Sequence, residues 1–263
     1  MDIKIFAVVV IYNREAGEAV TCQCLRHIKD IQVILTDNST EANHNKQYAQ
    51  ENGWMYVGMQ GNKGLPKAYN RSIKAIRERG SLVCLFDDDT EVEETYFSDL
   101  REKARSDAEA KVFLPQIYTS KGLLSPCIIG KVSVRYAENL DEVTDENMTA
   151  INSGMAIRTE VFDDYSYDEG YFLDYIDHAF IRDMKRLKYR ILVLDAKLKH
   201  DIFFEDPNTD IESVIRRFKV FKKDFSRFCG RSLVNRLRYF KWIYNMKRHF
   251  IRVHGWHIRL ALM

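Results

Sequence analysis

Apolar runs alternate with amphipathic segments along the first 120 residues of the chain. The run from Ile3 to Tyr12 is rich in β-branched residues and almost continuously hydrophobic, which predicts a central strand buried on both faces. Similar shorter runs occupy residues 31–36, 54–58 and 82–86, and segments with helical periodicity occupy residues 18–29, 43–52 and 67–79. This alternation predicts an α/β fold with a Rossmann-like, mostly parallel sheet and helices on both faces.

The second half of the chain extends this pattern and then changes character. Helices are expected at residues 93–110 and from about 174 to 187, strands at 111–118, 150–158 and 189–195, and a loop-rich stretch at 119–148. Beyond residue 212, aromatic and aliphatic side chains alternate with Lys and Arg at helical spacing. We therefore expect an α/β domain over residues 1–212 and a basic amphipathic helical extension over residues 213–263.

The charge of the chain divides at the same place. Residues 213–263 contain 14 Lys and Arg and one acidic residue, Asp224, whereas residues 1–212 contain 26 basic and 37 acidic residues. A basic amphipathic helix with aromatics suits a membrane surface or a polyanion. No nucleic-acid-binding motif is present, so a nucleic-acid partner is not expected. The simpler alternative is a pair of helices packed on the α/β domain with a basic outer face.

Three consecutive carboxylates, Asp87, Asp88 and Asp89, follow the apolar run at residues 82–86. The end of a buried strand is where open α/β sheets bind ligands, and adjacent carboxylates repel one another unless a cation relieves them. Their hard oxygen ligands suit Mn²⁺ or Mg²⁺, particularly when a diphosphate supplies further oxygens. A solvated acidic turn after a strand is the alternative.

Polar residues also follow the other predicted strands. Asn13 follows the first strand, Asp37 and Asn38 the second, and the loop with Gly61 and Asn62 comes after the third. In a doubly wound sheet these positions line up along one edge, so we expect a crevice with nucleotide-binding groups there. The alternative is that polar residues simply end strands.

Two further carboxylates, Asp174 and Asp177, lie three residues apart. In a helix they would share one face, although acidic residues in a first helical turn also complement the helix dipole. His200 follows the last predicted strand, and taken alone it is typical of a surface histidine.

The remaining features favour a cytoplasmic protein. Five cysteines without a framework spacing fit a reducing compartment. The opening apolar run is too short for a signal peptide and lacks a basic leader, and no apolar stretch is long enough for a transmembrane helix.

Taken in order, these motifs resemble glycosyltransferase family 2, whose members have the GT-A fold. The resemblance covers roughly residues 3–205 and rests on seven segments: Val10 to Arg14; Asp37 to Ser39; Gly61 to Gly64 followed by Ala68 and Asn70; Leu85 to Thr90, which matches the DXD pattern; Asn152 to Gly154; Phe172 to Asp177 ahead of Arg182; and the late His200. The form Phe-Leu-Asp-Tyr-Ile-Asp is most similar to bacterial rhamnosyltransferase-like and galactofuranosyltransferase-like members.

The resemblance implies an inverting, metal-dependent transferase that uses a UDP- or dTDP-sugar donor. Asp37 would bind the pyrimidine base, and Tyr12, Asn13, Asn62, Gly64 and Asn152 would line the donor pocket. Asp87 and Asp89 would flank the ribose and the metal-bridged diphosphate, Asp88 would face the ribose or solvent, and His200 would complete the metal site.

The resemblance also assigns the acceptor side. The general base would be Asp174 or, as second choice, Asp177, because many relatives have Glu-Asp where this chain has Asp174-Tyr175. The acceptor would be a hydroxyl of a glycan or of a lipid-linked glycan in bacterial surface polysaccharide synthesis. The basic extension would then hold the protein on the inner face of the cell membrane.

Two other functions compete with this prediction. Mg²⁺-dependent phosphohydrolases also place Asp-x-Asp-x-Thr after a strand, but Thr90 is one position too early for that motif. A non-catalytic module that binds membranes or polyanions would need only the basic extension, and the intact carboxylate set argues against it.

Overall fold

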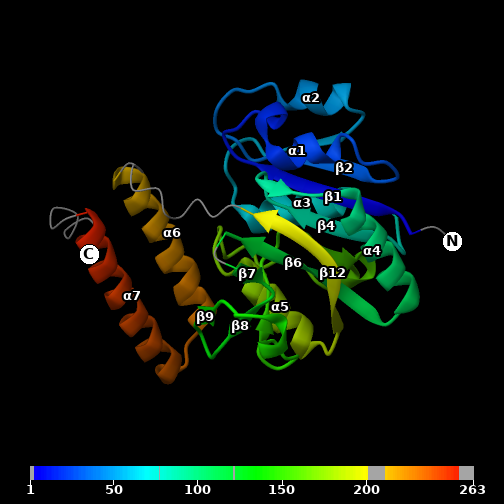
Figure 1. Ribbon diagram of the computed structural model, residues 1–263. Coiled ribbons are helices and arrows are strands. Elements are labelled where there is room, and N and C mark those ends of the chain that lie inside the picture. Colours follow the sequence, from blue (N-terminus) through cyan, green and yellow to red (C-terminus); the bar gives the residue numbers. More distant parts are fainter. Residues whose placement is uncertain (1–2, 77, 121, 201–210, 255–263) are drawn as a thin grey trace.

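A computed structural model describes residues 3–76, 78–120, 122–200 and 211–254 of the chain (Figure 1). Within this part, a nine-stranded sheet has the order β3-β2-β1-β4-β11-β6-β12-β5, and β7 pairs with β6. The α/β prediction is confirmed: β3, β2, β1 and β4 are parallel neighbours, and β12 is parallel to β6. β11 enters antiparallel between β4 and β6.

The strands of the large sheet are β1 (Ile5–Ile11), β2 (Gln32–Asp37), β3 (Met55–Gly58), β4 (Leu82–Phe86), β5 (Thr90–Glu91), β6 (Ala110–Thr119), β7 (Gly122–Ser125), β11 (Met155–Arg158) and β12 (Arg190–His200). The helices are α1 (Val20–Leu25), α2 (Asn45–Glu51), α3 (Leu65–Ala75), α4 (Glu94–Ser106), α5 (Ile176–Arg186), α6 (Ile211–Cys229) and α7 (Leu233–His254), with short 3-10 helices at η1 (Ala16–Glu18), η2 (Leu140–Glu142) and η3 (Thr159–Asp163).

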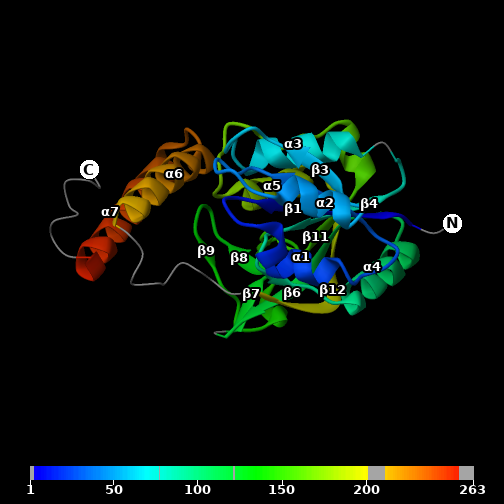
Figure 2. The same cartoon turned by 90° about the horizontal axis from the view of Figure 1, so that it is seen from above.

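The two faces of the sheet each have a hydrophobic core. Alternate side chains of β1 point to opposite faces, as the period of a strand requires: Ile5, Ala7 and Val9 lie in one core, and Phe6 and Val8 in the other. The first core includes residues of α1 and α4, and the second includes residues of α3 and α5. Figure 2 shows the two pairs of helices on opposite sides of the sheet. The predicted helices on both faces are therefore confirmed.

Residues 119–148 contain more regular structure than the sequence predicted. Strand β7 continues the large sheet, and a small three-stranded sheet has the order β10-β8-β9. Its members are β8 (Cys127–Ile129), β9 (Val134–Arg135) and β10 (Met148–Thr149). Most of this stretch lies outside helices and strands, as the loop-rich prediction has it, but strands of two to four residues are too short to show periodicity, so these elements were not predicted.

Helices α6 and α7 form an antiparallel hairpin beside β8 and β9 (Figure 1). The hairpin has its own apolar core around Phe218, Phe225, Tyr239 and Ile243, and Tyr175 of the α/β domain packs against this core. Phe228 belongs instead to the core that contains α3 and α5. The extension therefore packs on the α/β domain through α6. No helix in the described residues is long and apolar enough to cross a membrane.

Candidate functional site

The carboxyl ends of four parallel strands meet along one edge of the sheet. Ile11 of β1 is in register with Asp37 of β2, and Asp37 with Gly58 of β3. Val9 of β1 is in register with Phe86 of β4, which directly precedes the three aspartates. This edge therefore brings together the predicted polar positions that follow β1, β2 and β4.

Asp37 is buried at the end of β2 and already has two hydrogen-bond donors. Its Oδ1 accepts a bond from the Ser39 backbone N–H at 3.0 Å, and its Oδ2 accepts one from the Tyr56 hydroxyl at 3.0 Å. Burial, and then the bond to Asp37, raise the pKa of Tyr56 to about 12. Tyr56 therefore holds the Asp37 carboxylate in one orientation.

Asn13 joins the end of β1 to the loop after β2. Its backbone N–H donates to Ser39 Oγ at 2.9 Å, and its side-chain oxygen accepts the Thr40 backbone N–H at 2.8 Å. Asn13 has a positive φ of 48°, a conformation that Asn tolerates better than most residues. The neighbouring Tyr12 side chain is half exposed at this edge.

Asn62 and Gly64 shape the loop that leads into α3. Asn62 Oδ1 accepts bonds from the Asn38 side-chain amide at 3.0 Å and from the Gly64 N–H at 3.1 Å. Gly64 has a φ of 85°, and the next N–H, that of Leu65, donates to the Phe172 carbonyl at 2.8 Å. The loop is thus fixed between the β2 end and the segment that carries Asp174.

The three consecutive aspartates occupy the turn between β4 and β5. Asp88 forms an ion pair with Arg14 at 3.2 Å, which connects this turn to the end of β1. Burial, followed by the charges of Asp89, Asp88 and Asp177, raises the pKa of Asp87 to about 7. The negative charges of the turn itself and of α5 therefore both act on Asp87, and a bound cation would relieve that repulsion.

The donor set at Asp87 and Asp89 suits a divalent metal that is shared with phosphate oxygens. No cluster of three or more His, Cys, Asp or Glu side chains with metal-binding geometry is found in the described part of the chain. Mg²⁺ and similar ions are commonly held by one or two carboxylates together with substrate phosphates, so two aspartates fit that role. The His200 side chain lies outside the described residues, but its backbone pairs with Thr90, directly after Asp89.

Ser153 anchors the aspartate turn from the other side. Its hydroxyl accepts the Asp87 backbone N–H at 3.3 Å and is hydrogen-bonded to the Thr90 hydroxyl. Thr21 of α1 donates to the Asp87 carbonyl at 2.6 Å and accepts the Thr90 N–H at 2.8 Å. The adjacent Asn152 side chain is buried, and its Oδ1 has no hydrogen-bond partner among the described residues. A buried acceptor without a partner needs an explanation, and a bound ligand that donates to it would supply one.

Asp174 and Asp177 differ in position and in partners. Asp177 lies in the first turn of α5, but Asp174 precedes the helix, because Tyr175 adopts the left-handed conformation with a φ of 60°. The helix begins after Asp174, so the condition under which both carboxylates would share a helical face is not met. Asp174 forms a two-pronged ion pair with Arg217 of α6. Burial raises the pKa of Asp174, and Arg217 opposes this shift.

A cavity of about 600 Å³ opens beside both carboxylates. Its walls come from β7 to β9, the Leu173–His178 segment and the hairpin, and include Arg135, Tyr136, Tyr175, Phe221, Trp242 and Met246. Aromatic rings, carboxylates and a guanidinium in one cavity suit a polar ligand with flat apolar faces, such as a sugar.

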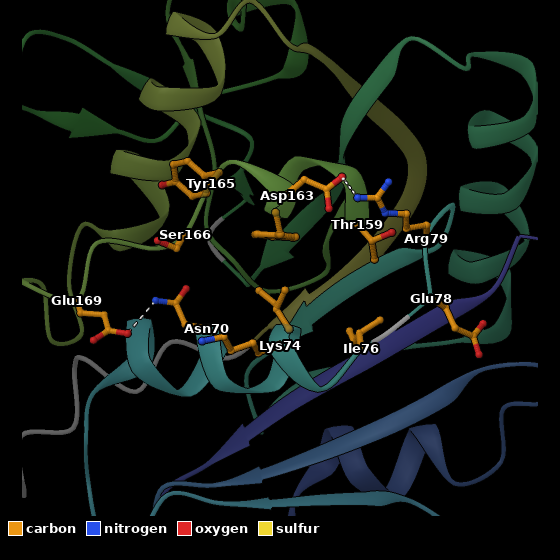
Figure 3. Close-up of a pocket in the computed structure, with 12 residues that line it drawn as sticks. Asn70, Lys74, Ile76, Glu78, Arg79, Thr159, Asp163, Tyr165, Ser166 and Glu169 are labelled. Atoms are coloured by element: carbon orange, nitrogen blue, oxygen red, sulfur yellow. Dashed lines mark hydrogen bonds and ion pairs between the residues drawn. The ribbon is translucent and has the colours of Figure 1, made fainter.

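A second cavity, of about 470 Å³, lies between α3 and residues 159–169 (Figure 3). Asn70 bonds Glu169 at its rim, and Arg79 pairs with Asp163 at 3.2 Å. None of the candidate site residues lines this cavity. It is therefore separate from the carboxylate edge.

Several contributors to the site were not singled out from the sequence. Each of them forms hydrogen bonds with a residue far away in the chain, and no local motif marks it: they are Tyr56, Thr21, Arg217 and Asp224. One signal was available for Asp224, because it is the sole acidic residue of the basic extension.

Comparison with known proteins gives a family match over most of the α/β domain. The model described as glycosyl transferase family 2 matches residues 6–166. Among curated proteins, the dTDP-rhamnosyl transferase RfbF of Shigella flexneri is 26% identical over 234 residues, which cover 83% of this chain and 77% of that protein.

Solved structures of low sequence identity share the fold. S. aureus TarS 1–349 in complex with UDP superposes with a TM-score of 0.55 at 15% identity and covers 94% of this chain and 72% of that one. Glucosyl-3-phosphoglycerate synthase from Mycobacterium tuberculosis, in complex with Mn²⁺, UDP and glucosyl-3-phosphoglycerate, has a TM-score of 0.54 at 15% identity, with 88% and 81% covered.

Proposed function

This chain belongs to glycosyl transferase family 2, and from that premise we propose that it transfers a sugar, with inversion, from a UDP- or dTDP-sugar to a hydroxyl of a glycan or lipid-linked glycan. The observation that carries the proposal is the shared edge at which β1, β2 and β4 end, which places the buried Asp37 and the consecutive Asp87, Asp88 and Asp89 on one side of the sheet. Carboxylates at such an edge suit a site that receives a cation together with a nucleoside diphosphate.

The donor would lie along the carboxyl edge of the parallel strands. Asp37, fixed by Tyr56, would accept a hydrogen bond from the pyrimidine base. Tyr12, Asn13, Asn62 and Gly64 would line the nucleoside pocket, and Asn152 would offer its buried oxygen to the donor. RfbF is described as a dTDP-rhamnosyl transferase, and TarS was solved with UDP, so both nucleotides are candidates.

Asp87 and Asp89 would hold Mn²⁺ or Mg²⁺, with His200 as a further ligand. When bound, the metal would act as a Lewis acid that neutralises the charge developing on the departing diphosphate. The related synthase was solved with both Mn²⁺ and UDP. Asp88, paired with Arg14, would face the ribose.

The base would be a carboxylate at the cavity beside α5. The acceptor oxygen would attack the anomeric carbon, the bond to the diphosphate would break, and the hydroxyl proton would pass to the carboxylate. The Arg217 guanidinium donates to both carboxylate oxygens of Asp174. Because Asp174 is engaged in this way, Asp177 is the better candidate for the base. Asp174 would then orient the acceptor together with Arg217.

The outward face of α7 would bring the enzyme to an acceptor at the membrane. Leu233, Leu237, Phe240 and Tyr244 share one helical face and are 57–82% exposed. Arg248 and Arg236 lie over the rings of Tyr244 and Phe240. An exposed apolar stripe flanked by cations suits the interface of an anionic bilayer. This arrangement supports a peripheral location on the cytoplasmic face of the membrane.

Family membership argues against the phosphohydrolase and the non-catalytic module. The experiment that tests the proposal measures thermal unfolding with UDP or dTDP, each with and without Mn²⁺. At 100 times Kd, a nucleotide adds about 2.7 kcal/mol of stability, which corresponds to roughly 5–10 °C in Tm for a domain of this size. A folded protein that neither nucleotide stabilises, with or without Mn²⁺, would contradict the proposal.

A further inference from the structure

The backbone segment that carries Asp174 is held by a carboxylate from the C-terminal hairpin. Asp224 of α6 is fully buried. Its Oδ2 accepts bonds from the N–H groups of Phe172, Leu173 and Asp174 at 3.1, 2.8 and 2.9 Å, and its Oδ1 accepts a second bond from Phe172 at 3.1 Å. Three successive backbone N–H groups that converge on one anion form a nest, and charge-assisted bonds of this type are strong.

Neighbouring side chains also join α6 to the segment that carries Asp174. Tyr175, which follows the segment, stacks on Phe225 with ring centroids 4.9 Å apart, and Arg217, two turns before Asp224 on α6, holds the Asp174 side chain. On its opposite side, the Phe172 carbonyl accepts the Leu65 N–H at the start of α3. The segment is thus fixed between α6 and the loop proposed to bind the nucleotide.

The sequence context indicates a specific role for this carboxylate. Asp224 is the single acidic residue among the 51 residues of the basic extension, at a buried helix position where an apolar side chain would be the ordinary occupant. Burial of a carboxylate is costly unless donors satisfy it, and here the donors all belong to the segment ahead of α5. General docking of the hairpin is already provided by Phe228 and by the exposed Arg227–Asp168 pair.

We propose that Asp224 is a positioning residue of the active site: its carboxylate fixes the Phe172–Asp174 backbone and thereby places Asp174 and the first turn of α5, with Asp177, at the acceptor. The α6 helix is then part of the catalytic apparatus as well as a connection to α7. This inference rests on the proposed transferase function for its kinetic consequence, while its structural consequence stands independently.

The test compares Asp224→Asn with Asp168→Asn in the full chain. The first replaces an oxygen of the nest with an amide that cannot accept the same bonds, and the second breaks an ion pair between α6 and the same loop without contact to residues 172–174. Turnover is measured as release of UDP or dTDP from nucleotide-sugars with octyl glycosides as acceptors, and UDP–Mn²⁺ binding by titration. Hydrogen exchange reports the amides of residues 172–174.

Asp224→Asn should lower kcat by about 100-fold, the effect of a displacement near 1 Å, and leave the UDP affinity within about twofold. Its 172–174 amides should exchange faster, and Asp168→Asn should change none of these quantities by more than about threefold. Unchanged amide exchange in Asp224→Asn, a kcat within threefold of the wild type, or an equal loss in Asp168→Asn would each overturn the inference.

Two further measurements distinguish failure of the Asp224 inference from a variant that does not fold and from failure of the transferase proposal. If Asp224→Asn does not fold, exchange in the wild-type protein decides: the 172–174 amides should be protected like those of α5, and exchange as fast as that of residues 138–146 would overturn the inference. If the wild type binds neither UDP nor dTDP, the transferase proposal fails, and the exchange measurements still test the Asp224 contact.

Discussion

Gly64 lies so close to Phe172 that a β-carbon at position 64 would be 2.7 Å from the Phe172 carbonyl oxygen. The two residues are 108 positions apart, yet Leu65, next to Gly64, donates its N–H to that same oxygen. The loop proposed to bind the nucleotide and the segment that carries Asp174 therefore touch through their backbones. A side chain at position 64 would therefore have to push the loop away from Phe172.

Gly64→Ala is expected to destabilise the protein and weaken nucleotide binding. Gly64 has a φ of 85° and a ψ of 159°, a conformation essentially confined to glycine that costs about 1–3 kcal/mol for a residue with a side chain, and the close contact with the backbone of Phe172 adds to this. The matched control is Gly53→Ala, because Gly53 has a φ of 67° with no atom within 4 Å of its added β-carbon. Urea unfolding and UDP titration measure both effects, and equal losses in the two variants would contradict the close approach.

Asp87→Asn is expected to raise the Tm of the metal-free protein at pH 8 while it abolishes stabilisation by Mn²⁺ and UDP. Folding raises the pKa of Asp87 from its ordinary value of 3.8 to about 7. The folded state thus binds the extra proton between these values, so stability falls as the pH rises from about 4 to 7. The Tm gain of the variant should shrink on going from pH 8 to pH 5. A gain independent of pH would show that Asp87 ionisation is not its cause.

Asp177→Asn is expected to reduce kcat by about 10²–10⁴-fold, the range for loss of a general base, with little change in nucleotide affinity. Asp174→Asn should reduce kcat less, because Arg217 already engages both oxygens of that carboxylate. Steady-state kinetics with UDP titration on both variants give the comparison. A larger loss of kcat in Asp174→Asn, with nucleotide binding retained, would identify Asp174 as the base.

Replacement of Leu237 and Phe240 by Ser is expected to weaken binding to vesicles of phosphatidylglycerol and phosphatidylethanolamine by more than tenfold. Each of these exposed side chains gains about 1.5–3 kcal/mol when it is fully buried in an apolar phase. The control is Met55→Ser with Leu187→Ser, since both residues are exposed but lie outside the hairpin. Sedimentation with vesicles measures binding, and the same loss in both double variants would argue against the α7 stripe.

Point substitutions are the appropriate probe of the extension. Deletion of residues 213–263 would also remove Arg217 and Asp224, and with them the contacts to Asp174 and to its backbone. A loss of activity after deletion would therefore not distinguish membrane binding from positioning of the active site.

The sequence by itself determined the features that depend on local periodicity. The buried run of β1 and the alternation of strands and helices predicted the parallel half of the sheet, because a period of 2 or 3.6 is written in neighbouring residues. The sequence also predicted that the carboxylates after β4 lie near the polar residues after β1 and β2, since parallel strands end at the same edge. The motif order was sufficient to predict the family.

Only the tertiary structure decided how distant residues meet. Asp174 lies outside α5 because Tyr175 takes a left-handed conformation. In this conformation the Tyr175 ring stacks on Phe225. Arg217 and Asp224 read as ordinary members of a basic amphipathic helix, and they reach the Asp174 segment because α6 packs on the α/β domain. Hydrogen bonds and ion pairs between residues 43 to 52 positions apart leave no periodic signal in the sequence, so the role of the extension in the site emerged from packing alone.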